Sequence, residues 1–252
     1  MERNSEVLSI ISFARMNRNF SLSIFLLFLS IYPLAAQQSS VRYAGTMRDA
    51  MWKGEIFGKI NLDTLQHKEH LYGIGPLANL QGEILINAGH AYQSRVNGSG
   101  SMQVIESYEA KAPFFVYDRV DHWVQYPLHD SIRTLQQIEH ALLEVSKIHP
   151  SPFSFFIMAV MDKGSIHVVN LPSGTIVHNP DEAHQGQVDF PIFQTEGQVV
   201  GFFSTQHQGI FTHHTSFVHA HFLSNNHQLM GHIDYAEFQP ATLKLFLPFS
   251  IP

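Results

Sequence analysis

Short apolar runs rich in β-branched and aromatic residues recur along most of this chain, and Gly, Pro and Asn separate them. Runs of this length and composition favour β-strands, and the residues between them favour turns. The pattern therefore constrains the chain to a fold dominated by β-sheet. Strands are predicted at residues 83–86, 114–117, 155–161, 165–170, 199–204, 217–223 and 232–238.

Helical periodicity is clear in one segment. Apolar residues recur at helical spacing from Ile132 to Val145, and prolines follow soon after. Asp130 or Ser131 is a suitable N-cap for this helix, because short polar side chains accept hydrogen bonds from the first free N–H groups. A second, shorter helix is predicted at residues 46–52.

Two prolines, Pro150 and Pro152, mark the best internal boundary of the chain. They follow the predicted long helix, and proline cannot continue a helix. The boundary divides a mixed α/β half at residues 40–149 from a more purely β half at residues 150–252. Each half has about 100 residues, so we expect the two to pack on each other.

Residues 1–36 are predicted to be a secretory signal peptide, with Met16 as an alternative start. A short cationic segment at residues 16–19 precedes an apolar run at residues 20–34, and small residues follow up to Ala36. This order is typical of export signals. The run is shorter than the roughly 20 residues that cross a bilayer, which disfavours the alternative of a membrane anchor. We therefore expect a periplasmic or extracellular protein that has no membrane association after cleavage.

The chain contains no cysteine, although exported proteins commonly use disulfides. Neither a disulfide nor a thiolate metal ligand is therefore available, and any metal must bind to histidines and carboxylates. The formal net charge of −6 and the absence of a Lys/Arg-rich stretch argue against a nucleic-acid partner. Of the 17 histidines, seven lie between His207 and His232, so this segment is the first candidate for a metal site.

A hairpin in this segment would bring three histidines together. His219 and His221 project from the same face of a predicted strand, because side chains alternate along a strand. After a turn at residues 224–228, the next strand carries His232. If His232 pairs with His221, all three imidazoles share one face, and Asp234 lies across from His219, where it would orient an imidazole. A register shifted by one residue would place His232 on the opposite face.

Three imidazoles with an open fourth position are a common construction of a catalytic zinc site. The alternative is a pair of histidine-rich strands that only decorate the surface. The third histidine, at a distance that suits a hairpin in a chain without cysteine, favours the metal site. We therefore predict Zn²⁺, or another divalent metal. Four other histidines are interpreted as loop residues and not as ligands: His207, His213, His214 and His227.

Glu83 is the second candidate for a site residue. It follows Gly82 and opens a strand that is otherwise apolar. A glutamate in such a position is often a solvated strand end, and this alternative stays open on the residues alone. No Gly-x-Ser-x-Gly motif of a nucleophilic serine is present in the chain.

Several segments of the chain follow one another in an order that is itself informative. These are residues 73–75, 81–86, 91–93, 111–114, 153–164, 197–202, 218–224 and 231–234. Together they resemble the α-acetolactate decarboxylase family, most specifically through Val-His-Ala-His-Phe-Leu-Ser followed by Gly-His-Ile-Asp. The resemblance extends from about residue 44 to residue 238, which is nearly the whole mature chain.

The resemblance implies an α/β protein of the α+β-like kind, with two packed β-sheet domains. One would be a mixed sheet with helices, and the other a smaller antiparallel sheet that carries the metal hairpin. It also implies zinc on His219, His221 and His232, with Glu83 as the catalytic residue in the same cavity. A homodimer is a candidate assembly for the protein.

The implied reaction converts 2-acetolactate, a 2-hydroxy-3-oxo acid, to acetoin and CO2. A metal that chelates the hydroxyl and carbonyl oxygens would act as a Lewis acid. It would stabilise the enediolate that remains when CO2 departs. Glu83 would then handle the proton that ends up on carbon. The implied reaction requires no organic cofactor.

The chain departs from the family pattern at three places. The strand that follows the Asp-Gly segment of the family carries an arginine, whereas residues 165–170 contain none. Pro76 stands where the family has a threonine, and the family's C-terminal glutamate has no counterpart. His167 or Lys163 is a candidate substitute for the arginine, although neither offers its planar fork for a carboxylate. His167 is also a candidate for an outer partner of the metal ligands.

Three alternatives follow from these departures. The first is a non-catalytic relative that binds a metal or a small ligand and has lost the arginine and the C-terminal glutamate. The second is a different zinc enzyme, such as an α-type carbonic anhydrase, but its third histidine lies much further along the chain. The third is a cupin, which is disfavoured because the fourth residue after His221 is Asn225 and not glutamate.

Overall fold

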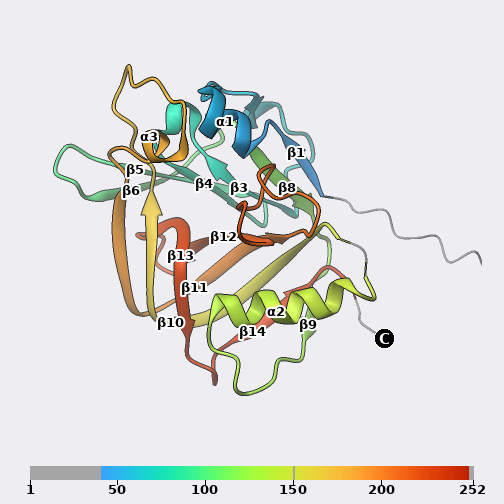
Figure 1. Ribbon diagram of the computed structural model, residues 1–252. Helices are drawn as coiled ribbons and strands as arrows, with labels where there is room; N and C mark the ends of the chain where they lie inside the picture. Colours follow the sequence, from blue (N-terminus) through green and yellow to red (C-terminus); the bar gives the residue numbers. More distant parts are fainter. Residues whose placement is uncertain (1–40, 150, 250–252) are drawn as a thin grey trace, which may run out of the picture. The chain divides into compact units, whose positions relative to one another are not determined.

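The computed structural model describes residues 41–149 and 151–249 (Figure 1). The signal peptide predicted at residues 1–36 lies outside the described residues. Three α-helices occur in the part of the chain that the structure describes: α1 (Met47–Lys53), α2 (Leu135–Ser146) and α3 (Pro180–Ala183). Two short 3-10 helices lie at Leu62–Thr64 and Ala78–Leu80. None of these helices is long and apolar enough to span a bilayer.

Two six-stranded sheets contain most of the strands. The first sheet has the order β1 (Arg42–Ala44), β8 (Phe115–Arg119), β3 (Leu71–Pro76), β4 (Glu83–Asn87), β5 (His90–Val96) and β6 (Met102–Glu106). The second has the order β11 (Val188–Phe203), β12 (Val218–Ser224), β13 (Met230–Phe238), β10 (Phe153–Val168), β14 (Lys244–Leu247) and β9 (Val124–Tyr126). A separate pair joins β2 (Ile60–Asn61) to β7 (Lys111–Ala112).

The α+β-like class predicted from the sequence is confirmed, but the expected mixed sheet and smaller partner sheet are wrong. Every pairing between the named strands is antiparallel, and the two main sheets have six strands each. Strands β3 to β6 follow one another through short connections, which only antiparallel neighbours permit. The domain boundary at residue 150 stays a prediction, although β9, from the first half, belongs to the second sheet.

Most predicted strands are present, but two of them belong to one long strand. The runs at residues 155–161 and 165–170 correspond to β10, whose 16 residues pair along their length with the equally long β11. In the sequence, Asp162 and Gly164 indicate a break between two strands. In the structure, the register shift between Met161 and Lys163 absorbs this break without ending the strand.

The long helix begins later than the sequence pattern indicates. Its N-cap is Thr134, not Asp130 or Ser131, because Thr134 accepts from the backbone N–H of Gln137 and the Gln137 side chain accepts from the N–H of Thr134. This reciprocal pair is a capping box, which satisfies two otherwise free N–H groups. The shorter helix α1 agrees with the prediction within one residue, and Thr46 caps it.

The second sheet is buried on both faces. Towards the first sheet, Val200, Phe202 and Leu223 pack with Ile74 and Leu85. On the opposite face, α2 lies across the sheet (Figure 1) and contributes three buried residues to the core. These are Ile138, Leu142 and Val145. Strand β12 and the first four residues of β13 are therefore buried in the core, whereas the second half of β13 includes exposed residues.

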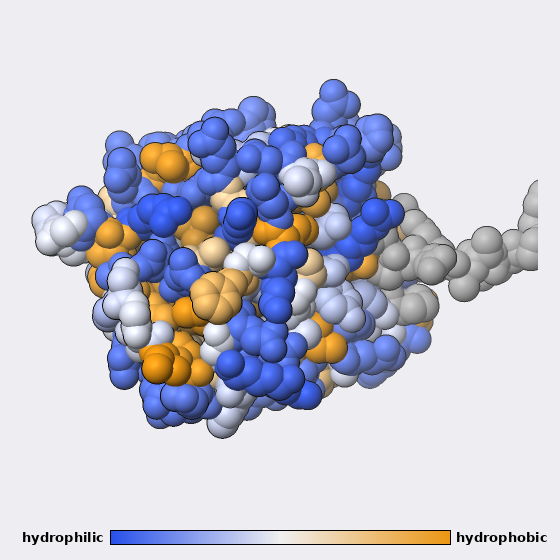
Figure 2. Space-filling view, turned by 90° about the horizontal axis from the view of Figure 1, so that it is seen from above, coloured by the Kyte–Doolittle hydropathy of each residue, from blue (hydrophilic) through white to orange (hydrophobic). Residues whose placement is uncertain are grey.

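The face that carries α1 and α3 is mainly hydrophilic, with separate apolar areas (Figure 2). Large apolar side chains that stay exposed include Trp52, Phe57 and Ile176. Folded proteins commonly leave such side chains in water, because apolar atoms make up more than half of a typical accessible surface. These side chains alone therefore mark no interface.

Close packing between β13 and β10 leaves no room for a side chain at Gly231. A Cβ added there would clash with the backbone carbonyl oxygen of His167 on β10. We expect Gly231→Ala to lower the free energy of unfolding by about 1–3 kcal/mol, as overpacking of a core does. Urea unfolding measures this change, with Gly98→Ala as the control because nothing lies within 4 Å of a Cβ at Gly98. Equal midpoints for the two variants would contradict the expectation.

Candidate metal centre

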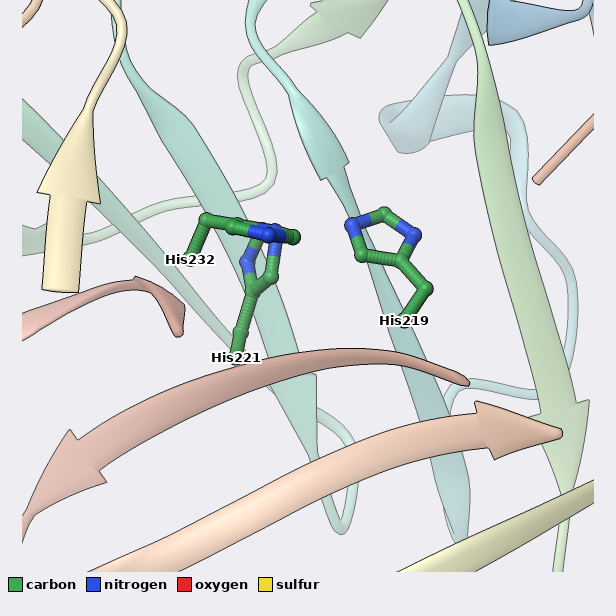
Figure 3. A group of neighbouring side chains, drawn as sticks. All are labelled: His219, His221 and His232. Carbon is green, nitrogen blue, oxygen red and sulfur yellow. The ribbon is translucent and has the colours of Figure 1, made fainter. Parts of the chain in front are cut away.

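The hairpin of β12 and β13 brings His219, His221 and His232 together. His221 pairs directly with His232, so the register that the sequence analysis considered is confirmed. The imidazoles share one face, with ring centroids 5.0–5.4 Å apart. One ring nitrogen from each residue lies within 4.8 Å of the other two, and Figure 3 shows the three rings gathered around one space.

The donor atoms of this cluster fit a divalent metal. Nδ1 of His219 and both ring nitrogens of His221 are buried, and none has a hydrogen-bond partner among the described residues. Buried polar atoms without partners are rare in folded proteins and cost free energy. Four-coordinate zinc with bonds of 2.0–2.1 Å holds its nitrogens about 3.4 Å apart. The three nitrogens, which lie within 4.8 Å of one another, would move closer together to bind an ion.

Burial also determines the protonation of the three rings. It lowers the pKa of His219 to about 3 and places the pKa values of His221 and His232 well below the usual value. The cause is the loss of water around a ring that would otherwise carry charge. The rings are therefore neutral at pH 7, and neutral imidazole is the form that binds metals.

Glu83 lies beside the cluster and not at a solvated strand end. It begins β4 in the first sheet, and its side chain is directed across the interface between the two sheets. Only 2% of the residue is exposed. Its Oε2 is 3.7 Å from Nε2 of His221, and its Oε1 accepts a hydrogen bond from the backbone N–H of Val169. Burial raises the pKa of Glu83 well above its usual value. The structure thus brings Glu83 to the histidines, while its catalytic role stays a prediction.

Asp234 contacts a different histidine from the one expected. Its carboxylate lies 2.6 Å from Nδ1 of His167, whereas the sequence analysis placed it across from His219. Asp234 falls between the pairs Ile166↔Ile233 and Ser165↔Tyr235, so it is the extra residue of a β-bulge. A bulge redirects side chains, and here Asp234 reaches the β10 residue that lies directly opposite His232.

His167 is the residue of β10 closest to the cluster. It pairs with His232 across the strands, and the two ring centroids are 4.7 Å apart. It is buried and lines the small cavity at the cluster. Lys163, the other candidate substitute for the family's arginine, precedes His167 on β10, where it pairs with Glu237. It does not line this cavity.

Two histidines at this cavity, His184 and His213, were not predicted from the sequence as site residues. The cavity has a volume of about 30 Å³, and its polar lining is Glu83, His167, His184, His213, His219 and His232. His213 does lie in a loop, as expected, but its Nε2 is only 3.1 Å from Nε2 of His232. Burial lowers the pKa of His213 to about 4. The only signal for His213 in the sequence was its place among seven clustered histidines.

A larger cavity opens on the other side of the cluster. It has a volume of about 550 Å³ and lies beneath α2, where Glu139 and Thr134 form part of its wall. His213, His232 and Asp234 also line it. A small molecule in this cavity would therefore reach the cluster at the edge that His213 and His232 form.

These features define a class of protein: a two-sheet α+β fold with a buried three-histidine centre and an adjacent carboxylate, as metal-dependent enzymes use. The model of a protein family described as alpha-acetolactate decarboxylase matches residues 43–247. The chain therefore belongs to the α-acetolactate decarboxylase family.

Solved structures share the fold at low sequence identity. The acetolactate decarboxylase of Bacillus subtilis subspecies spizizenii is 21% identical, with a TM-score of 0.66 over 84% of this chain and 87% of that one. The enzyme of Bacillus subtilis strain 168 is also 21% identical, with a TM-score of 0.64 over 83% and 84% of the two chains. A Staphylococcus aureus protein of unknown function, similar to alpha-acetolactate decarboxylase, is 16% identical, with a TM-score of 0.64 over 82% and 84%. A search of curated proteins found no match.

Proposed function

We propose that this protein catalyses the decarboxylation of 2-acetolactate to acetoin and CO2 with a bound divalent metal, zinc first among the candidates. The observation that carries the proposal is the buried cluster of His219, His221 and His232, with unpartnered ring nitrogens, beside Glu83 in a member of this family. Neutral imidazoles without cysteine suit zinc, although other divalent metals accept the same ligands.

The residues of the site would have different roles in the reaction. The three histidines would hold a cation that acts as a Lewis acid and stabilises the negative charge that develops as CO2 leaves. Glu83 would deliver the proton that takes the place of CO2 on carbon, because its carboxyl group lies at the cluster and is shielded from water. Asp234 would orient His167 through their hydrogen bond.

A second candidate function is a non-catalytic relative that binds a metal or a small ligand. The observation in its favour is the lining of the small cavity, in which no arginine takes part among the described residues. Arginine binds a carboxylate through two parallel hydrogen bonds, and an imidazole supplies at most one such bond per ring nitrogen. Substrate turnover distinguishes the two functions.

The test is an incubation of the purified protein with racemic 2-acetolactate, followed by measurement of acetoin. We expect acetoin formation above the spontaneous rate, a fall to the spontaneous rate after the metal is removed with a chelator, and recovery when Zn²⁺ is added. Spontaneous decarboxylation without protein is the baseline. Full metal occupancy without acetoin above this baseline would favour the non-catalytic relative.

A further inference from the structure

His213 approaches the three-histidine cluster from outside the hairpin. It belongs to the segment between β11 and β12, and its Nε2 lies 3.1 Å from Nε2 of His232. Its ring centroid is 4.9 Å from that of His232 and 6.2 Å from that of His219. The ring spacing to His232 is thus as short as the spacings within the triad, and the ring spacing to His219 is about 1 Å longer. His213 is not part of the group of histidines whose nitrogens all lie within 4.8 Å of one another, so its side chain must move towards His219 and His221 for all four to bind one ion.

The backbone holds this segment in place on both sides of His213. On one side, the N–H of Met47 in α1 donates to the carbonyl oxygen of Ile210 at 2.8 Å. On the other side, the N–H of Phe217 donates to Glu139 of α2 at 2.6 Å. Hydrogen bonds to two helices therefore hold the segment on both sides of His213, whose own side chain is partly buried.

Two imidazole nitrogens 3.1 Å apart need either a hydrogen bond or a shared cation between them. A hydrogen bond from one ring to the other meets this need for His213 and His232, but it leaves the buried nitrogens of His219 and His221 without partners. A single cation that accepts a lone pair from each ring satisfies all of these residues together. The distance between nitrogens of about 3.4 Å around tetrahedral zinc is also close to the 3.1 Å observed.

We propose that His213 is a fourth ligand of the metal, supplied by the segment between β11 and β12. This inference rests on the proposed function, since it requires that the triad hold a metal. The same residue forms part of the wall of both the small cavity with Glu83 and the larger cavity beneath α2. His213 would therefore occupy the fourth coordination position of the metal, on the side from which a substrate would enter through the larger cavity. A 2-hydroxy-3-oxo acid that chelates the metal would have to displace His213 or bind beside it.

The test compares metal binding by the wild-type protein, His213→Ala and His214→Ala. His214 is the matched control, because it is the next residue of the same segment and is exposed. Zn²⁺ affinity is measured by competition with a chromophoric chelator, and ligand number is followed by the visible absorption of the Co²⁺-substituted protein. We expect His213→Ala to weaken Zn²⁺ binding by about 100-fold or more and to change the Co²⁺ spectrum, and His214→Ala to change neither. Loss of an outer partner alone costs about 10–100-fold.

The Co²⁺ spectrum distinguishes a residue that binds the metal directly from a residue that affects metal binding only through His232. Weaker Zn²⁺ binding with an unchanged Co²⁺ spectrum would overturn the proposal, as would wild-type affinity in His213→Ala. His213→Gln, with circular dichroism to verify folding, repeats the test with a side chain of similar length. A wild-type protein that binds neither metal would overturn the proposed metal site as well, whereas metal binding unaffected by His213→Ala would overturn this inference alone.

Discussion

Replacing His221 with alanine is expected to remove the metal from the protein and to lower acetoin formation by about 1000-fold or more. His221 is one of the three histidines of the cluster, paired with His232, and its Nε2 is 3.7 Å from Oε2 of Glu83. A Lewis acid contributes several kcal/mol to a transition state, and each 1.36 kcal/mol is a factor of ten in rate. Metal content after dialysis and the initial rate of acetoin formation measure the two effects.

The control for this substitution is His140→Ala, which removes an exposed histidine of α2. It should keep both the metal and the activity of the wild-type protein. Because His221 is fully buried, circular dichroism must verify that His221→Ala is folded, and His221→Gln provides a variant of closer size. A folded His221→Ala protein with full metal content would remove this residue from the ligand set.

The sequence was sufficient to predict the hairpin because its information is local. Side chains alternate along a strand, so His219 and His221 had to share a face, and the short turn at residues 224–228 limited the register of the pairing. The choice of the pairing with His232 also follows from burial. A shift of β12 by one residue would have turned its two faces over. His219 and His221 would then occupy the buried side beneath α2 on which Ala220 and Phe222 pack.

Other parts of the site depend on contacts between distant segments, which no local pattern contains. Glu83 is buried because the first sheet packs on the second, and a glutamate at the start of an apolar strand is otherwise expected in water. Asp234 reaches His167 because of a bulge that depends on the pairing of β13 with β10. His213 is placed by helices that precede it by many residues.

Replacing Glu83 with glutamine is expected to lower the rate of acetoin formation by about 100-fold or more while the protein keeps its metal. Glutamine has nearly the same size, and its amide oxygen can still accept the hydrogen bond from Val169. It cannot take up and release a proton as a carboxyl group does, and positioned acids and bases contribute about 10²–10⁴-fold to rates. Acetoin formation and metal content are measured on the same sample.

The matched control is Glu106→Gln, which removes an exposed carboxylate from β6 of the same sheet and should leave both quantities unchanged. The combination of rate and metal content then assigns the role of Glu83. A slow variant that retains its metal supports proton transfer. A slow variant that has lost its metal would show that the carboxylate, 3.7 Å from His221, is itself a ligand. A variant as fast as the wild-type protein would exclude Glu83 from the mechanism and leave the proton on carbon to come from water or from the histidines around it.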